Sequence, residues 1–435
     1  MGAISRRGVV AGLGLGLAAP AIARAARPVD TDVVVIGAGA AGLAAARSLR
    51  RAGRRVMVLE ARTRIGGRAY TDRTALGAPF DRGAHWLHSA EVNPFLAEAR
   101  RLGRRTWVSG EDGITIYRQG RPLTDGDERL EQAIAQLERR AGLRGLLGQD
   151  FPLSAAAGDE MQQAAAAFAA FTMATDSNRL SAQDYGALAG GEDEVVEGGY
   201  GRLLADLYAE VPVRTGQTVR RIDWRQRDRV TISGEFGALE ARRVVITIPP
   251  PVLAAGAVAF DPPLPPQRQR ALAALEGGRF VKVGLRLDGA TPQAPEFAFD
   301  LDAALGGRTS ALYLERRSPV ATVIFSGSHA RDLSAAGAQA LTDAARQVLA
   351  TVLGAQALRR VQATTVADWS ADPLARGAYT VARIGEADAR ERYAEPLAGR
   401  LFFAGDSAAS PYAITVMGAR RSGEAAAAAI LKVAA

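Results

Sequence analysis

The stretch that decides the fold is residues 32–42, DVVVIGAGAAG. A short run of β-branched residues ends there in three glycines with the spacing G-x-G-x-x-G, and an alanine- and leucine-rich segment continues to Arg51. A second apolar run, residues 55–59, follows Gly53 and leads to Glu60. This succession of strand, glycine turn, helix and strand predicts a βαβ unit that binds a dinucleotide.

Each glycine of the turn has its own predicted role. Gly37 permits the tight turn, Gly39 lets the backbone approach a pyrophosphate, and Gly42 lets the helix pack on the strand. Ala41 lies in the first turn of that helix, whose unpaired N–H groups and positive dipole end favour phosphate. Glu60 is placed to accept hydrogen bonds from ribose hydroxyls, and a carboxylate there disfavours a 2′-phosphate. The site is therefore expected to take FAD or NAD rather than NADP.

Composition excludes several classes of protein. The chain has 435 residues, enough for about two or three compact units. It contains no cysteine, so disulfides, thiolate nucleophiles, iron–sulfur clusters and cysteine-bound zinc are ruled out, and with three histidines no metal site is predicted. The formal net charge is +8, but the arginines are scattered among acids, so nucleic-acid binding is not expected. Only two of the 54 basic residues, Lys282 and Lys432, are lysines.

The N-terminus resembles a twin-arginine signal peptide. Arg6 and Arg7 precede an uncharged, glycine- and alanine-rich stretch that runs to Ile22, and residues 21–25 carry small-x-small cleavage patterns. The stretch is too short and too rich in glycine for a membrane span. We therefore expect residues 1–25 to be removed, the protein to leave the cytoplasm folded around its cofactor through the Tat machinery, and the mature chain to be periplasmic or secreted without a stable membrane span.

Residues 60–68, EARTRIGGR, follow directly on the second strand. This segment resembles the E-A-x-x-R-x-G-G-R signature of the flavin-containing amine oxidases, a family that includes monoamine oxidases, polyamine oxidases, L-amino-acid oxidases and flavin histone demethylases. The resemblance implies FAD as the cofactor, with contacts from Ala61, Arg62, Gly67 and Arg68. Glycines allow the backbone to pass beneath the flavin, and the guanidinium of Arg68 can neutralise pyrophosphate.

Further blocks resemble segments of that family in the same order along the chain. Residues 83–88, GAHWLH, followed by Asn93 and Pro94, are similar to a segment of polyamine and spermine oxidases that lies at the flavin and the substrate cavity. Later family segments correspond to residues 197–200, 218–222, 244–249, 401–406 and 415–419. The resemblance places the cofactor against Gly83, Ala84, His85, Trp86, Val219, Trp369, Gly405, Asp406, Thr415, Val416 and Ala419.

Three residues are expected at the reaction centre. Lys282 lies in a block, residues 275–283, that resembles the family segment whose lysine holds a water against flavin N5. Tyr379 takes the position of an aromatic wall of the substrate cage, whereas Thr415 stands where monoamine oxidases have the second aromatic wall. The His88 match points to polyamine-type amines, and a purely structural histidine stays open. Ala378 replaces the cysteine that bonds flavin in monoamine oxidases, so the FAD is expected to be non-covalent.

The expected architecture is an α/β fold in which a Rossmann-like FAD-binding domain carries an inserted α+β substrate domain. The FAD-binding domain is predicted to comprise residues 30–90, 197–262 and 396–435, and the substrate domain residues 91–196 and 263–395. Residues 127–170 are predicted to be largely helical, and residues 280–326 strand-forming.

The resemblance implies oxidation of a primary or secondary amine, with a polyamine-like substrate favoured. Hydride passes from the α-carbon of the neutral amine to flavin N5, the imine hydrolyses, and O2 is reduced to H2O2. Two alternatives stay open. One is another flavin oxidoreductase of the superfamily, such as an L-amino-acid oxidase or a desaturase, and the other is a non-enzymatic FAD-binding partner protein. An amino acid needs an arginine clamp and a polyamine needs carboxylates, and the sequence places neither.

Overall fold

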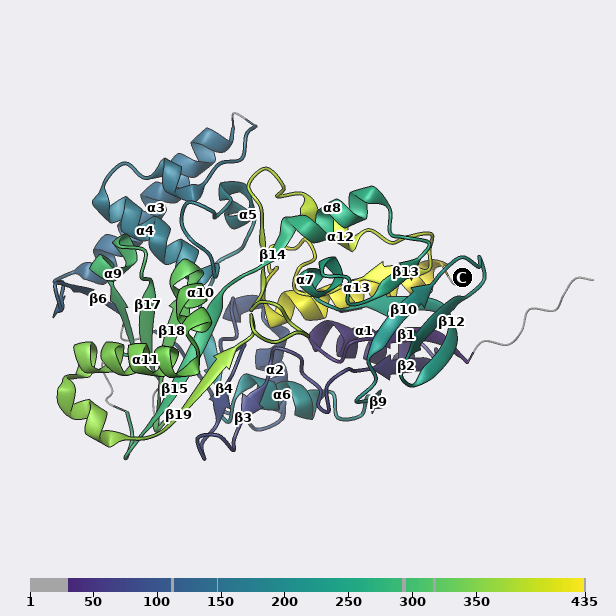
Figure 1. The fold of residues 1–435 in the computed structure, drawn as a ribbon, viewed down its shortest axis with the longest axis horizontal. Coiled ribbons are helices and arrows are strands. Elements are labelled where there is room, and N and C mark those ends of the chain that lie inside the picture. Colours follow the sequence, from purple (N-terminus) through teal and green to yellow (C-terminus); the bar gives the residue numbers. More distant parts are fainter. Residues whose placement is uncertain (1–29, 111–112, 147, 292–294, 316–317, 434–435) are drawn as a thin grey trace, which may run out of the picture.

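Two β-sheets, each with helices of its own, divide the molecule into two lobes (Figure 1). The computed structural model describes residues 30–110, 113–146, 148–291, 295–315 and 318–433. The predicted signal peptide, residues 1–25, lies outside the described residues. Among the helices that the structure describes, none is both long enough and apolar enough to cross a bilayer.

The first sheet has the strand order β13-β10-β11-β12-β1-β2-β9, and β21 pairs with β12. Its strands are β1 (Thr31–Ile36), β2 (Val56–Leu59), β9 (Val213–Arg214), β10 (Val219–Asp223), β11 (Val230–Gly234), β12 (Gly237–Ile246), β13 (Ala259–Asp261) and β21 (Leu401–Phe403). β1 runs parallel to both β2 and β12. The predicted βαβ unit is thereby confirmed.

Helices cover both faces of this sheet, which explains why residues 33–36 of β1 are continuously apolar. Val33 and Val35 join the core under α1 (Ala40–Arg51) and α13 (Val416–Val433), whereas Val34 and Ile36 join the core on the opposite face. The helices α7 (Pro250–Ala254), α8 (Pro266–Ala274) and α12 (Ala389–Ala394) supply that second core.

The second sheet has the order β19-β15-β18-β17-β16-β6-β7. Its strands are β6 (Ile114–Arg118), β7 (Arg121–Pro122), β15 (Phe280–Leu287), β16 (Phe297–Asp300), β17 (Ser310–Leu314), β18 (Val320–Ser326) and β19 (Val361–Asp368). One face packs against α10 (Gly327–Ala336) and α11 (Ala338–Leu353), and the other against α3 (Gly126–Gly145), α4 (Glu160–Thr172) and α9 (Leu301–Leu305). The predicted α+β lobe is confirmed, while its exact boundaries stay a prediction.

The remaining elements are short and lie outside the two large sheets. The small two-stranded sheets are β3 (Thr71–Asp72) with β4 (Phe80–Asp81), β5 (Thr106–Val108) with β8 (Glu194–Val196), and β14 (Leu275–Gly277) with β20 (Thr380–Ala382). The remaining helices are α2 (Pro94–Arg101), α5 (Ala182–Gly186) and α6 (Tyr200–Leu207), with 3-10 turns at Ala90–Val92, Leu153–Ala156 and Ala355–Arg360.

A buried ion pair joins α5 to α12 and so links the two lobes. The Arg390 guanidinium donates from Nε to Asp184 Oδ1 at 2.6 Å and from Nη2 to Oδ2 at 2.9 Å. Both side chains are almost completely buried, at 5% and 1% exposure. Because each charge satisfies the other in a bidentate geometry, the pair can exist away from water.

Candidate active site

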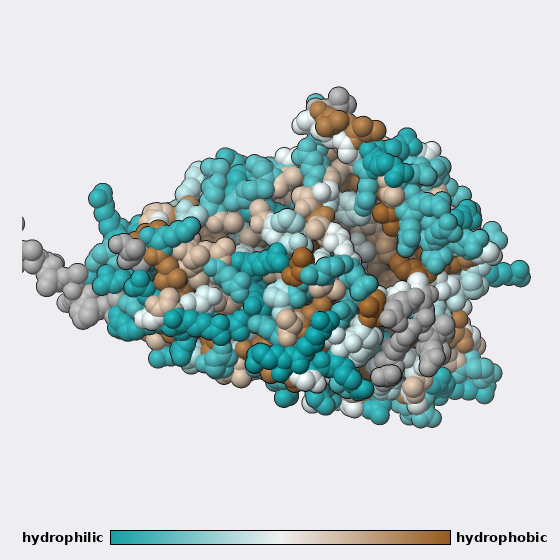
Figure 2. Space-filling model, turned by 180° about the vertical axis from the view of Figure 1, so that it is seen from behind, coloured by the Kyte–Doolittle hydropathy of each residue, from teal (hydrophilic) through white to brown (hydrophobic). Residues whose placement is uncertain are grey.

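A cavity of about 1270 Å³ lies between the two lobes. Figure 2, which views the molecule from behind relative to Figure 1, shows a hollow in the surface with hydrophobic side chains inside it. Every residue that the sequence analysis assigned to the cofactor or to the reaction lines this one cavity, with the exception of Gly42. Segments more than 370 residues apart in the chain, from Gly37 to Ala419, therefore meet at one place.

The glycine turn forms one end of the cavity. Gly37 has φ +102°, and a Cβ on it would lie 2.3 Å from Thr247 Oγ1. Gly42 is outside the lining because it serves packing: a Cβ there would lie 2.0 Å from the carbonyl oxygen of Gly37. By contrast, a Cβ on Gly39 would meet no atom within 4 Å. The space at Gly39 is thus open for a ligand, as the predicted approach to a pyrophosphate requires.

Glu60 is buried and organises the turn directly. Its Oε2 accepts the N–H of Ala38 at 2.7 Å, and its Oε1 accepts the N–H of Arg62 at 2.8 Å. The sequence suggested only a contact with ribose. The geometry adds that this carboxylate ties the glycine turn to the segment that follows β2.

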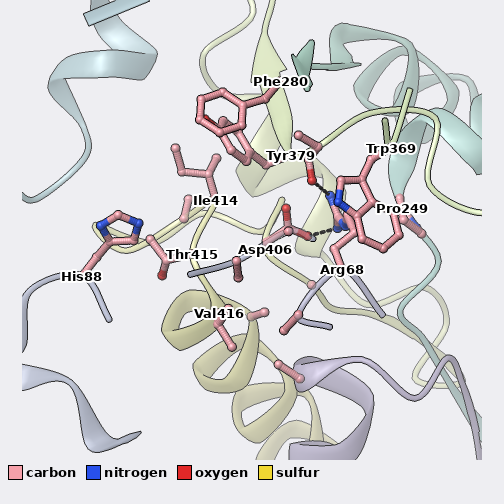
Figure 3. Close-up of a pocket in the computed structure, with 18 of the residues that line it drawn as sticks. Arg68, His88, Pro249, Phe280, Trp369, Tyr379, Asp406, Ile414, Thr415 and Val416 are labelled. Atoms are coloured by element: carbon pink, nitrogen blue, oxygen red, sulfur yellow. Dashed lines mark hydrogen bonds and ion pairs between the residues drawn. The ribbon is translucent and has the colours of Figure 1, made fainter. Parts of the chain in front are cut away.

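Two arginines of the EARTRIGGR segment bind acids from distant parts of the chain. Arg62 makes a bidentate pair with Asp372, at 2.8 and 3.0 Å. Arg68 donates to Asp406 at 2.5 Å and to the carbonyl of Ala378 at 2.6 Å (Figure 3). Both guanidinium groups thereby hold C-terminal segments against the cavity, in addition to any contact with phosphate.

Lys282 lies on β15 and is buried. Its Nζ donates to the carbonyl of Gly83 at 2.7 Å and reaches that of Asp81 at 3.4 Å. The ammonium lies 5.0 Å from the centre of the Trp86 ring, which is a cation–π arrangement. Burial lowers the pKa of Lys282 to about 8, although the negative charges of Asp81 and Glu315 act in the opposite direction. The side chain therefore changes its protonation within an ordinary assay range.

A buried network stands behind Lys282. Asp81 Oδ2 lies 3.0 Å from His85 Nδ1 and accepts the N–H of Tyr200 at 3.1 Å, and Asp81 Oδ1 accepts the Thr71 hydroxyl at 2.5 Å. Burial raises the pKa of Asp81, but these hydrogen bonds and the charge of His85 outweigh it and leave the pKa below its usual value. His85 Nε2 lies 3.3 Å from the Tyr313 hydroxyl. Both nitrogens of His85 are therefore engaged within the protein.

Aromatic rings form the end of the cavity that is opposite the glycine turn. The Tyr379 ring centre lies 6.0 Å from that of Phe280, which lies 5.6 Å from that of Phe171 (Figure 3 shows the first two). The Tyr379 hydroxyl donates to the carbonyl of Thr172. Trp369 donates from Nε1 to the carbonyl of Arg82 at 2.9 Å. Tyr379 is thus held by the Phe280 ring and by the hydrogen bond of its hydroxyl.

The chain matches the family described as flavin containing amine oxidoreductase over residues 40–187 and 160–431. It belongs to that family. As a member, it is an FAD-dependent amine oxidoreductase with the fold predicted from its sequence.

Individual relatives of this amine oxidoreductase span nearly its whole length. Polyamine oxidase 4 from Oryza sativa is 29% identical over 464 residues, which cover 95% of this chain and 91% of the relative. Lysine-specific histone demethylase 1B from Mus musculus is 26% identical over 91% of this chain and 52% of its own. Among solved structures, cyclohexylamine oxidase from Brevibacterium oxydans IH-35A has a TM-score of 0.77 at 24% identity, covering 94% of this chain and 100% of its own. A double mutant of putrescine oxidase reaches 0.79 at 21%, covering 92% and 99%.

The residues of this amine oxidoreductase fit FAD. The cavity runs from the open space at Gly39 to the aromatic wall at Tyr379, so an elongated ligand can reach both ends. The N-terminal turns of α1 and α13 both contribute to its lining, and helix N-termini favour negative charge. Because the whole chain lacks cysteine, a cysteine–flavin bond is ruled out.

His88 lies at a different part of the lining, away from Trp369 in Figure 3. Its Nδ1 is 2.9 and 3.0 Å from the two carboxylate oxygens of Asp193, and its side chain is 44% exposed. Asp193 lies in a short acidic run that by itself indicates only a solvated loop, so it could not be identified from the sequence. The partnership with His88 appears only in three dimensions.

Thr415 caps α13. Its hydroxyl accepts the N–H of Gly418 at 2.9 Å and donates to the carbonyl of Tyr412 at 2.8 Å. The residue lines the cavity as predicted, but its polar group serves the helix end. Other lining residues escaped the sequence analysis because they lie in no family block: Phe151, Phe168, Phe171, Phe297 and Ile414.

Proposed function

We propose that this amine oxidoreductase oxidises amines that carry no carboxylate, with polyamine-like substrates favoured, and passes the electrons to O2. The observation that carries the proposal is the distribution of charge along the cavity. The arginines of the described lining are Arg62, Arg68, Arg82 and Arg220, and they belong to the FAD-side segments. The inserted lobe contributes three acids to this lining, Glu138, Asp193 and Glu296, and one basic residue, Lys282.

This distribution favours a cationic substrate over an amino acid. Arg62 and Arg68 are already paired with Asp372 and Asp406, so they are not available as a clamp for an α-carboxylate. Carboxylates beside aromatic rings suit an ammonium group, through charge and through cation–π contact. An L-amino-acid oxidase would need the reverse arrangement.

The residues around the reaction centre have distinguishable tasks. Bound FAD supplies a two-electron acceptor for the amine. Tyr379 and Phe280, whose rings are tilted by 45° to each other, offer the aromatic surface against which the substrate is oriented. Lys282, held by the carbonyl of Gly83, presents a group whose charge is lost above a pH of about 8. The surrounding apolar side chains exclude water from the C–H bond that breaks.

An anaerobic titration of the purified holoenzyme tests the proposal. Putrescine, spermidine, cyclohexylamine and benzylamine are each mixed with it at pH 8, L-leucine and L-phenylalanine serve as the comparison, and flavin absorbance is followed. We expect amines to bleach the flavin and amino acids to leave it oxidised. Faster bleaching by the amino acids would overturn the substrate proposal, and bleaching by no compound would favour the non-enzymatic partner protein. Release of peroxide after air is admitted distinguishes an oxidase from a dehydrogenase. Acid precipitation should release the flavin into the supernatant if it is bound non-covalently.

We also propose export of the folded protein by the Tat machinery, with a periplasmic or secreted destination. What supports this is the pattern around Arg6 and Arg7 alone. Replacing both by lysine in the full chain should leave the flavoprotein in the cytoplasm, whereas the unaltered chain is recovered outside it. Equal distribution of the two would contradict the proposal.

A further inference from the structure

Ile414 has a backbone conformation that its side chain disfavours. Its φ is +62°, in the left-handed region. Within the described residues, the other non-glycine positions with positive φ are Ser89, Gln119, Asp125, Ala174, Arg376 and Ala398, and none of these is β-branched. A β-branched residue in this region is strained, and such strain persists only where the surrounding structure enforces it.

Contacts on both sides of Ile414 enforce this conformation. Its N–H donates to the carbonyl of Asp406 at 2.7 Å, and Asp406 is itself held by Arg68. On the other side, Thr415 is fixed as the cap of α13. The backbone is therefore anchored immediately before and after the point at which it would otherwise relax.

With this left-handed backbone conformation, the Ile414 side chain enters the cavity. Ile414 lines the cavity and packs, partly buried, against the apolar cluster that contains Phe171 and borders Phe280. In Figure 3 it points toward the Phe280 and Tyr379 rings, while Thr415 lies lower in the view. Thr415 has its hydroxyl committed to the helix end, so the bulkier neighbour supplies the apolar surface at this point.

We propose that Ile414 is a specificity-determining residue that limits the width of the amine admitted beside Tyr379. This inference rests on the proposed function, since it assigns to that same site the feature that selects substrates by shape. A slim amine passes the Ile414 side chain, whereas a wide one meets its branched carbon. The bulk stands there only because the backbone is forced into the left-handed region.

The test uses amines that cannot be oxidised, so that binding is measured apart from turnover. Neither tert-butylamine nor 1-adamantylamine has hydrogen on the carbon that bears nitrogen, and they differ in width. Their dissociation constants are measured on the holoenzyme from the change in flavin absorbance, for the unaltered protein and for Ile414→Gly, Ile414→Ala and Ile414→Val. In Ile414→Gly and Ile414→Ala, we expect the affinity for 1-adamantylamine relative to tert-butylamine to increase by about tenfold or more. Ile414→Val, which keeps the branch, should change it by less than about twofold.

Thermal unfolding separates the strain from the lost bulk. Ile414→Gly relieves the backbone and should unfold at a temperature no lower than that of Ile414→Ala, which keeps the disfavoured φ. If the glycine variant does not bind FAD, the alanine variant carries the width test alone. An unchanged ratio in every variant would overturn the assignment of Ile414.

The two proposals fail in different ways. In one outcome, the ratio of dissociation constants shifts but no oxidisable amine reduces the flavin. That outcome would support the role of Ile414 and contradict the proposed function. Amine oxidation with an unchanged ratio would do the reverse. With cyclohexylamine and butylamine as oxidisable partners, kcat/KM should shift in the same direction as the binding ratio.

Discussion

The two ends of the cavity are built in different ways. At the glycine turn, the lining includes two short stretches that are close in the sequence and rich in glycine and alanine, and Gly37, Gly39, Gly66 and Gly67 belong to them. At the aromatic end, single side chains arrive from separate elements, among them Phe171 of α4, Phe280 of β15 and Tyr379 before β20. The first end tolerates little change because backbone atoms touch one another. The second can change its selectivity one side chain at a time.

The joint between the lobes should carry the largest effect. Replacing Arg390 by Met leaves the Asp184 carboxylate buried without its partner, so we expect a loss of about 3–5 kcal/mol in the free energy of unfolding. The double variant Asp184→Leu with Arg390→Met should recover much of that loss, because no charge is left unpaired. Chemical denaturation of all three proteins measures it. A single variant as stable as the parent would mean that the pair does not hold the lobes together.

The backbone-built end is tested by two neighbouring glycines. Gly42→Ala places a Cβ 2.0 Å from a carbonyl oxygen, so the apoprotein should lose about 1–3 kcal/mol of stability. Gly39→Ala meets no protein atom, and the apoprotein should keep its stability while FAD affinity falls about tenfold or more, or about 1.4 kcal/mol. Unfolding of the apoproteins and FAD titration distinguish the two. Equal losses of apoprotein stability would remove the contrast.

Lys282 lines the same cavity, and its removal should act on rate. Lys282→Met should slow flavin reduction or reoxidation by about tenfold or more, which corresponds to about 1.4 kcal/mol. The exposed Lys432 near the C-terminus provides the matched control, since Lys432→Met should change neither half-reaction. Stopped-flow measurements of both variants check this. Unchanged half-reactions in Lys282→Met would exclude the role assigned from the family resemblance.

The same substitution has a consequence for stability against pH. The Lys282 pKa is about 8 in the folded protein and 10.5 in the unfolded chain, so between these values the unfolded chain binds a proton that the folded protein does not. Stability therefore rises with pH through this window, and the unaltered protein should gain about 3 kcal/mol relative to Lys282→Met. Denaturation at pH 7.5 and pH 10.5 measures the difference. A difference that is the same at both pH values would contradict the lowered pKa.

The smallest effect is expected at the partly exposed pair of His88 and Asp193. His88→Gln and Asp193→Asn each weaken one half-exposed pair, so stability should fall by no more than about 1 kcal/mol. If His88 meets the substrate, KM for amines should rise about threefold or more in His88→Gln with kcat little changed. A KM that stays constant while stability falls would identify His88 as a structural residue.

The glycine-turn end of the cavity could be predicted from the sequence to a larger extent than the aromatic end, for a physical reason. The βαβ unit could be predicted because it depends on local spacing, a glycine turn followed by a helix start. The EARTRIGGR segment and the lysine of β15 are singled out by their resemblance to family segments. Asp193, Phe171 and Ile414 could not be identified, because nothing in their local patterns differs from an acidic loop, a helix core or an apolar residue before a helix. Their significance comes from partners in distant segments.

The sequence by itself determined the family and the cofactor, through the segments that resemble flavin-containing amine oxidases. It also determined the glycine turn after β1, since backbone geometry there follows from a short run of glycine and small residues. Only the tertiary structure decided how charge is distributed along the cavity and which side chains form its aromatic end. It also decided that Ile414 presents apolar bulk to the cavity, next to Thr415. The hydroxyl of Thr415 accepts a hydrogen bond at the start of α13. The Ile414 N–H donates to the carbonyl of Asp406, whose side chain is paired with Arg68. These contacts hold the backbone so that the Ile414 side chain enters the cavity.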